Sequence, residues 1–265
     1  RLDARRTLKS LVADLRYKKD VLGKSGCCNV NFLVCDNKYY VMDNHLCASW
    51  CWEQKINPIY HYGIFHIDRH YDLLNNLSDV YLRTNHDRLT GTNFDNFKSL
   101  ADANGIRFDN YIDTFCRLHP GLLIKAYYCT HQDGSDWHNM SLEPISSDAT
   151  DVKIYDLVDN VDYWIGKSDI EHWILNIDLD FFFQGQGEEG YYRFLTTHYV
   201  KKLCRAIKKV LDKIDVISIA LSPEFCNGWG QAFDVLHIFE DELGFKMPFR
   251  YCKIGGRDIL EECHT

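Results

Sequence analysis

Two short stretches of the sequence combine the end of an apolar run with acidic and histidine side chains at alternate positions. The first contains Asp68, His70 and Asp72, and the second contains Asp178 and Asp180. Side chains alternate in direction along an extended chain, so the members of each group are expected to point to the same side. A turn or capping role is the alternative for Asp178, but unpaired acids at a buried strand end are costly. The pattern therefore predicts two strand ends at which metal-binding side chains gather.

Apolar segments with strand-like composition alternate with helix-like segments along the chain. This alternation is typical of an α/β protein with a mainly parallel sheet covered on both faces. A length of 265 residues is sufficient for a single domain, residues 1–265. The sequence predicts a β-hairpin at 29–43, strands at 62–68, 122–129, 152–158, 172–178 and 215–221, helices in 1–26, 45–55, 75–120 (in pieces), 197–214 and 228–243, a long loop at 131–150 and a Gly-rich turn at 184–190.

Composition excludes several classes of protein. The chain has 30 basic and 38 acidic residues, a net charge of −8, which argues against a nucleic-acid binder because such proteins need a basic face. No apolar run approaches the roughly 20 residues that span a bilayer, and we expect neither a signal peptide nor membrane association. The eleven cysteines include no Cys-x-x-Cys pair, so a thiolate zinc site is not expected. Reduced, mostly buried cysteines in a cytoplasmic protein are the expectation.

A third expected strand end also carries an acid, Glu224. Because open parallel sheets bind their ligands beyond the carboxyl ends of the strands, the three strand ends should deliver acids to one rim. A mainly oxygen ligand set with one or two imidazoles favours Mn²⁺ or another hard octahedral metal over structural zinc. Two ions about 3.5–4 Å apart would polarise and deprotonate a bridging water, giving a nucleophile at neutral pH. The sequence thus points to a hydrolase.

The motif Asp-x-His-x-Asp, followed much later by Asp-x-Asp, resembles the metal signature of the arginase/agmatinase (ureohydrolase) superfamily. That superfamily has a further metal-binding histidine, for which His45 stands in the corresponding place, and a glutamate that binds the substrate guanidinium, which Glu224 matches. The resemblance covers about residues 40–230 and implies a three-layer α/β/α arginase-like fold with two Mn²⁺ per chain. It implies His45, Asp68, Asp72 and Asp178 as ligands of one ion and Asp68, His70, Asp178 and Asp180 as ligands of the other, with Asp68 and Asp178 bridging both.

Several residues in and around the motifs differ from those of ordinary arginases. Leu73 and Leu74 stand where polar residues usually hold the ammonium and carboxylate of a free amino acid, and the Phe181-Phe182-Phe183 run replaces the usual Asp-Pro. The Gly-Gly lead-in before the first histidine is also absent. In these residues the sequence resembles the divergent arginase-like branch that includes the peptide arginases of ribosomal peptide biosynthesis. The resemblance implies conversion of arginine side chains in a precursor peptide to ornithine, with release of urea.

Several assignments keep alternatives. His86 lies at a comparable distance after the first motif to the proton-shuttle histidine of arginases, and His131 and His138 in the expected long loop are its rivals. His45 could instead be a surface loop histidine, and Glu224 could be a helix-start acid favoured by the helix dipole. For function, the alternatives are a small-molecule ureohydrolase, a deacetylase-like amidohydrolase with one zinc, and a non-catalytic module that keeps a metal for structure.

Overall fold

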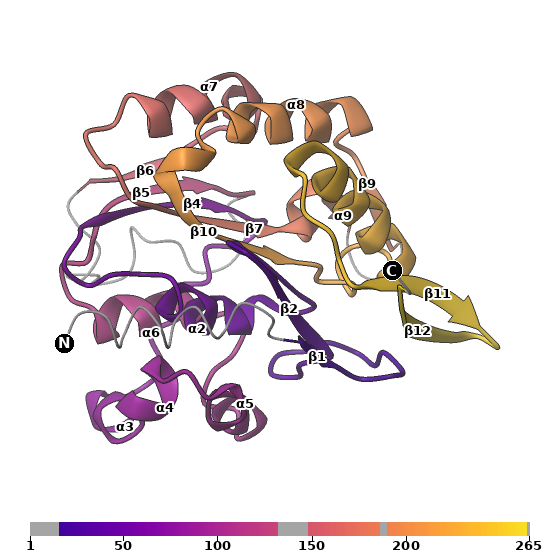
Figure 1. Ribbon diagram of the computed structural model, residues 1–265, viewed down its shortest axis with the longest axis horizontal. Coiled ribbons are helices and arrows are strands. Elements are labelled where there is room, and N and C mark those ends of the chain that lie inside the picture. The colour runs from indigo at the N-terminus through magenta and orange to yellow at the C-terminus, as the bar shows by residue number, and fades with distance from the viewer. Residues whose placement is uncertain (1–15, 132–147, 186–189, 264–265) are drawn as a thin grey trace.

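An eight-stranded sheet with helices on both faces forms the centre of the protein, as a computed structural model that describes residues 16–131, 148–185 and 190–263 shows (Figure 1). The predicted α/β class with a mainly parallel sheet in three layers is thereby confirmed. The strands, in spatial order, are β1 (Arg16–Lys18), β2 (Phe32–Asp36), β3 (Tyr39–Met42), β10 (Ile214–Ala220), β7 (Trp173–Asp178), β4 (Tyr62–Ile67), β5 (Leu123–Cys129) and β6 (Ala149–Asp151).

The six strands from β3 to β6 are parallel, whereas β1 and β2 join antiparallel at one edge. The predicted N-terminal hairpin is β2 and β3. Its turn contains Asn37 at φ 55°, a left-handed conformation that asparagine tolerates better than most residues. The central strands β4 and β7 are buried along their whole length, because helices cover both faces of the sheet at this point.

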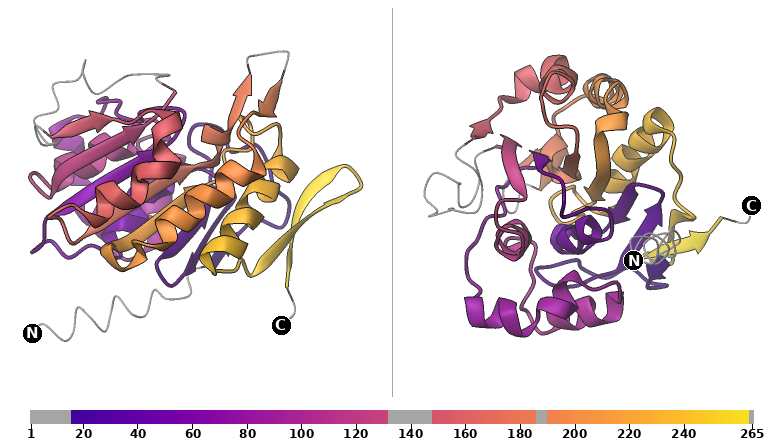
Figure 2. Two further views of the ribbon diagram at one scale, coloured as in Figure 1. Left: turned by 90° about the horizontal axis from the view of Figure 1, so that it is seen from above. Right: turned by 60° about the vertical axis from the view of Figure 1, so that its left-hand side comes forward.

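Three long helices lie side by side on one face: α7 (Ile154–Gly166), α8 (Thr197–Lys208) and α9 (Trp229–Leu243) (Figure 2). The opposite face is covered by α2 (Ala48–Glu53) and α6 (Tyr111–Leu118), with α3 (Asp79–Thr84), α4 (His86–Thr90) and α5 (Phe94–Asp102) farther out (Figure 1). Alternation along the strands divides the core accordingly. Ile64 and Ile174 face α2 and α6, and Phe65 and Leu175 face the three long helices.

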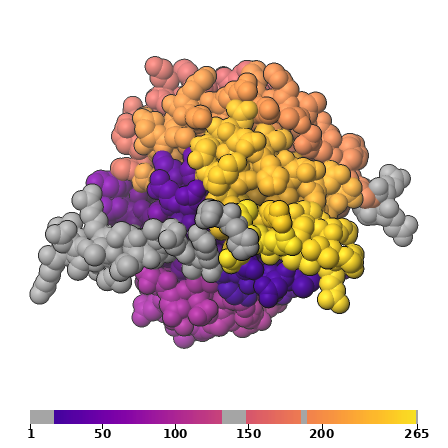
Figure 3. Space-filling model, turned by 45° about the vertical axis from the view of Figure 1, so that its right-hand side comes forward, coloured from indigo at the N-terminus to yellow at the C-terminus, as the bar shows by residue number. Residues whose placement is uncertain are grey.

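Two small ribbons were not anticipated from the sequence. One pairs β8 (Phe183–Gly185) with β9 (Tyr191–Arg193), and the other pairs β11 (Phe249–Ile254) with β12 (Arg257–Glu262). The second ribbon lies beside the N-terminal part of the chain, where Leu22 N donates to Asp258 O at 2.9 Å (Figure 3). The two ends of the described chain are therefore in contact.

The remaining predictions have mixed outcomes. The strand predicted at 152–158 is wrong: β6 already supplies the short pairing with β5, and α7 begins at Ile154 with one apolar face buried against the core. The helix predicted in 1–26 is wrong for its described part, which contains β1. The helix predicted at 197–214 ends at Lys208 and is followed by a 3-10 turn, η5 (Leu211–Lys213). Most of the loop at 131–150 and of the turn at 184–190 lies outside the described residues. Among the helices described, none is long and apolar enough to cross a membrane.

Candidate metal centre

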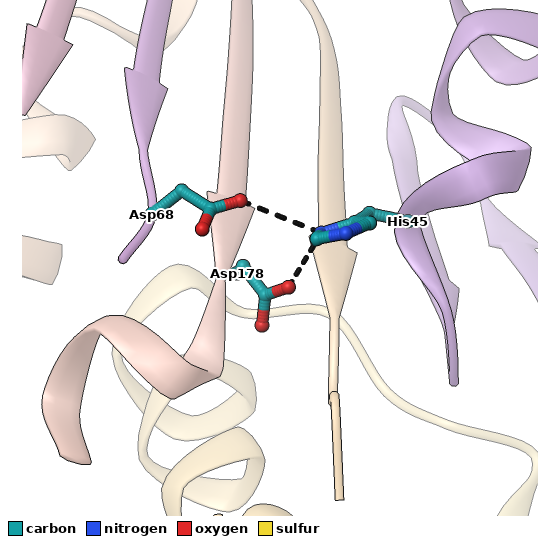
Figure 4. A group of neighbouring side chains, drawn as sticks. All are labelled: His45, Asp68 and Asp178. Carbon is teal, nitrogen blue, oxygen red and sulfur yellow. Dashed lines mark ion pairs between the residues drawn. The ribbon is translucent and has the colours of Figure 1, made fainter. Parts of the chain in front are cut away.

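The carboxyl ends of neighbouring parallel strands bring the predicted ligands together. Asp178 closes β7, and Asp68 follows β4, which pairs with β7 through Ile67 and Ile177. His45 begins the short 3-10 helix η1 (His45–Cys47) after β3 and points at both acids (Figure 4). All three side chains are nearly or fully buried. The fold thus places residues that are more than 100 positions apart in the sequence in one cluster.

Two imidazoles approach the carboxylates from different sides. His45 Nδ1 lies 2.5 Å from Asp178 Oδ2 and 3.4 Å from Asp68 Oδ2, and His45 Nε2 lies 3.4 Å from Asp72 Oδ2. His70 Nδ1 lies 3.5 Å from Asp68 Oδ1 and 3.4 Å from an oxygen of a sixth residue, Asp180. Asp68 therefore directs one oxygen to each histidine, which is the arrangement expected of an acid shared between two ion sites.

Local turns hold the acids in place. The Asp68 carboxylate accepts the backbone N–H of His70 at 2.7 Å, and the Asp178 carboxylate accepts that of Asp180 at 3.1 Å. Such contacts two residues along the chain are a typical turn interaction of aspartate. Asp178 Oδ2 also accepts the Ser222 hydroxyl at 2.6 Å. These bonds fix the two side chains and leave both carboxylates aimed at the cluster.

Burial and mutual charge shift the protonation of the cluster strongly. Burial followed by the charges of Asp178 and Asp68 raises the pKa of Asp180 to about 6. Burial opposes charge on His70, but Asp180 and Asp68 outweigh it and raise the pKa of that ring to about 11. The pKa of His45 is likewise raised well above its ordinary value, because the negative charge around it exceeds the effect of burial. Without a metal, protons on the imidazoles therefore compensate the acids.

The donor set fits divalent metal ions. Three buried atoms of the cluster have close ionic contacts but no hydrogen bond: His45 Nδ1, Asp68 Oδ2 and Asp72 Oδ2. Buried polar atoms left in this way are rare and costly, and an ion coordinated by them would satisfy all three. Among the described residues, three groups offer ligand atoms within 4.8 Å of one another: His45 with Asp68 and Asp178, His66 with Asp68 and Asp72, and Asp68 with His70 and Asp180.

Glu224 lies at the mouth of this cluster, after β10, and is half-buried. A small cavity of about 20 Å³ is lined by Glu224, His45, His70 and Asp180, among others. Ser25 also lines this cavity. Its backbone N–H donates to Glu224 Oε1 at 2.5 Å. A space of this size has room for one water molecule or ion, so a larger group reaching Glu224 has to displace Ser25.

The segment that carries Ser25 was not anticipated as part of the site. Its anchor is Asp43, a fully buried acid that accepts the Ser25 hydroxyl at 2.7 Å and the backbone N–H groups of Asn31 at 2.9 Å and Phe32 at 3.2 Å. No periodic pattern marks residues 22–31, and the only local signal is the acid at the end of β3. The cover over the cavity is therefore a product of tertiary contacts.

The structure does not bring the predicted shuttle His86 to the cluster. His86 is exposed in α4, lies 3.5 Å from Asp87 Oδ1, and does not line the cavity. His131 follows β5 and is partly buried, with Nε2–H directed at the Phe181 carbonyl at 2.9 Å. His138 lies outside the described residues. The identity of a proton shuttle thus stays a prediction, and the placement of His86 does not support it.

Comparison of the sequence with protein families and with curated proteins gave no match. Among solved structures, the chain is similar to an arginase of Entamoeba histolytica in complex with L-ornithine, at 14% identity and a TM-score of 0.45, covering 77% of this chain and 69% of that one. It is similar to the Helicobacter pylori arginase at 12% identity and a TM-score of 0.38, covering 76% and 72%. It is also similar to the agmatine ureohydrolase of Thermoplasma volcanium, at 13% identity and a TM-score of 0.44, covering 77% of this chain and 61% of that one.

Proposed function

We propose that the protein is a metal-dependent hydrolase that converts arginine side chains of a peptide to ornithine and releases urea. The observation that carries the proposal is the buried cluster of four aspartates and two histidines, with a glutamate at its mouth. A buried group of this charge has little structural use without a cation, because desolvation of each carboxylate costs several kcal/mol by order of magnitude. We therefore infer that the cluster is a binding site for metal ions.

Two Mn²⁺ ions are the proposed cofactors. The ligands are mostly carboxylate oxygens, which suit hard octahedral metals, with imidazole as the only nitrogen donor. His45, Asp72 and Asp178 would hold one ion and His70 and Asp180 the other, with Asp68 and Asp178 shared. When bound, such a pair supplies Lewis acidity that turns water into a nucleophile at neutral pH.

Glu224 is the proposed partner of the guanidinium group. A planar guanidinium offers paired N–H donors that match a carboxylate, and Glu224 is the acid at the cavity mouth that accepts a backbone N–H rather than an imidazole. The substrate would replace the Ser25 N–H on this carboxylate. Phe225, whose ring packs 5.7 Å from that of His70 and 5.6 Å from that of Tyr191, forms an apolar wall beside the group. This wall would exclude water from one side of the bound guanidinium.

An arginine within a peptide is favoured over free arginine. Leu73 is fully buried in the core on the α2 and α6 side, and neither it nor Leu74 has a side-chain group that binds an ammonium or carboxylate. A peptide residue has neither free charge, so the absence of these contacts costs it nothing. The natural partner would then be an arginine-containing precursor peptide.

Urea release tests the proposal. Protein loaded with Mn²⁺ is incubated with a peptide that has an internal arginine and blocked ends, and with free L-arginine in parallel. We expect urea and a mass loss of about 42 Da per arginine from the peptide, the loss that guanidinium hydrolysis requires, and much slower release from free arginine. The Asp68→Asn protein serves as the control for metal-independent hydrolysis.

The other outcomes identify the alternatives. Faster release from free arginine indicates a small-molecule ureohydrolase. Acetate from an acetyl-lysine peptide, without urea, indicates a deacetylase-like enzyme. Bound Mn²⁺ with no turnover of either peptide indicates a module that keeps its metal for structure.

A further inference from the structure

A row of polar side chains crosses the sheet directly below the metal cluster. His66 in β4 is in register with Asn176 in β7, and Asn176 is in register with Ser218 in β10. The exposed fraction of each is 1% or less. Central strands of parallel sheets are normally apolar at such positions, and buried polar groups are costly unless they are bonded. Three adjacent polar residues at this depth therefore need an explanation.

The three side chains belong to one hydrogen-bonded chain with a fixed direction. Trp52 Nε1–H donates to Ser218 Oγ at 3.0 Å, Ser218 Oγ–H donates to Asn176 Oδ1 at 2.6 Å, and Asn176 Nδ2–H donates to His66 Nδ1 at 2.8 Å. His66 Nε2–H donates to the backbone carbonyl of His70 at 2.9 Å. An indole can only donate and a carbonyl can only accept. With the Asn176 amide oriented as given, the bonds run in one direction from Trp52 to the His70 carbonyl, so His66 accepts at Nδ1 and donates from Nε2.

This chain reaches the metal cluster at two points. The His70 carbonyl belongs to the turn between Asp68 and Asp72, and Asp72 has φ 54°, a conformation that is uncommon for residues other than glycine and needs support from its surroundings. At the second point, Asn176 Nδ2 also donates to the Tyr111 hydroxyl at 2.8 Å, and the Tyr111 ring stacks on His45 with centroids 5.2 Å apart. Ligands of both proposed ion sites are therefore braced by the same row.

We propose that His66 is a positioning residue that fixes the turn 68–72 so that its ligands converge on the metal ions. The inference rests on the proposed metal centre and assigns His66 a role in it other than that of a ligand. His66 lies close enough to Asp68 and Asp72 to form one of the candidate groups, with Nε2 at 3.7 Å from Asp68 Oδ2. Both of its nitrogens are already used, however, one as an acceptor from Asn176 and the other as a donor to His70.

Two substitutions separate the two nitrogens. His66→Gln keeps an N–H donor at the distance of Nε2, toward the His70 carbonyl, whereas His66→Asn reaches only as far as Nδ1, toward Asn176. We expect His66→Asn to weaken Mn²⁺ binding about 10–100-fold, the usual effect of losing a partner that orients a ligand, and His66→Gln to recover most of it. The dissociation constant is measured by the electron paramagnetic resonance signal of free Mn²⁺. His172→Asn is the matched control, because His172 lies at the opposite, amino-terminal end of β7, where its Nδ1 is 2.9 Å from Asp215 Oδ2.

Each result has a definite meaning. Equal losses in His66→Gln and His66→Asn would make His66 a direct ligand, and unchanged affinity in both would reduce the row to a structural feature; either overturns the inference. If His66→Asn does not fold in the presence of a chelator, Ser218→Ala removes the donor that orients Asn176. It should then weaken Mn²⁺ binding by at least about threefold, toward the lower end of that range, and unchanged affinity would overturn the inference. A wild-type protein that binds no Mn²⁺ would instead remove the proposed metal centre, and this inference with it.

Discussion

Replacing Asp68 by asparagine should abolish the stabilisation of the protein by Mn²⁺. Asp68 is the residue common to all three of the groups of described residues that could hold an ion, and its side chain is fully buried. Asparagine has nearly the same shape but lacks the charge and one oxygen. Because each proposed ion takes an oxygen of Asp68, a single substitution should impair both sites.

The magnitude follows from linkage. An ion at 100 times its dissociation constant stabilises the folded state by about 2.7 kcal/mol. For a chain of this size, 1 kcal/mol shifts the unfolding midpoint by about 2–4 °C. We therefore expect Mn²⁺ to raise the midpoint of the wild-type protein by about 5–10 °C over its value in chelator, and that of Asp68→Asn by less than about 1 °C.

Thermal unfolding in chelator and in increasing Mn²⁺ measures the effect. The quantity compared is the shift within each protein, so any loss of basal stability in the variant cancels. Asp212→Asn, an exposed acid in η5 ahead of β10, provides a control of the same chemistry and should keep the full shift. An Asp68→Asn protein that retains the wild-type shift would refute the cluster as the binding site.

Three further predictions concern pH, the substrate acid and the sheet. In chelator, the stability of the folded protein should fall as pH rises, because the pKa values of Asp180 (about 6) and His70 (about 11) in the folded state lie above their values in the unfolded state. The stabilising proton of Asp180 is lost between about pH 4 and 6, and that of His70 between about pH 6.5 and 11. A flat profile of unfolding midpoints against pH would contradict this. Glu224→Gln should keep both ions, measured by elemental analysis, yet lose at least about a hundredfold in kcat/KM, or about 2.7 kcal/mol; near-normal urea release would show that another group binds the guanidinium. Gly63→Ala should destabilise the fold by about 1–3 kcal/mol, since its Cβ would lie 2.5 Å from the Trp173 ring; an unchanged denaturant midpoint would show that the ring moves freely.

The sequence by itself determined the strand ends and the acids on them. Asp68 and Asp178 lie at the carboxyl ends of apolar runs of strand length. The expected extended alternation beyond these ends is wrong, because Asp180 lies in a 3-10 helix, η3 (Leu179–Phe182), and the chain bends at Asp68 and Arg69 after β4. The order of strands and helices was likewise sufficient for a mainly parallel sheet. These features depend on local patterns, so a single sequence contains them.

Local patterns were insufficient where a segment has two possible partners. Residues 152–158 are apolar enough for a strand, but Ala149–Asp151 forms the short strand on β5 and the following residues turn into α7. The apolar stretch could then bury its side chains as one face of a helix. The outcome depended on which segment reached the edge of the sheet, and the composition of the segment does not contain that information.

Only the tertiary structure decided how the ligands are held and covered. Ser25 reaches Glu224 across 199 positions, and Asn176 bonds His66 across 110 and Ser218 across 42. In the sequence each of these is a single polar residue with no periodic signal. Their partners are set by the register of parallel strands and by the path of the chain over the cavity, because hydrogen bonds between distant residues exist only once the chain has brought them within about 3 Å.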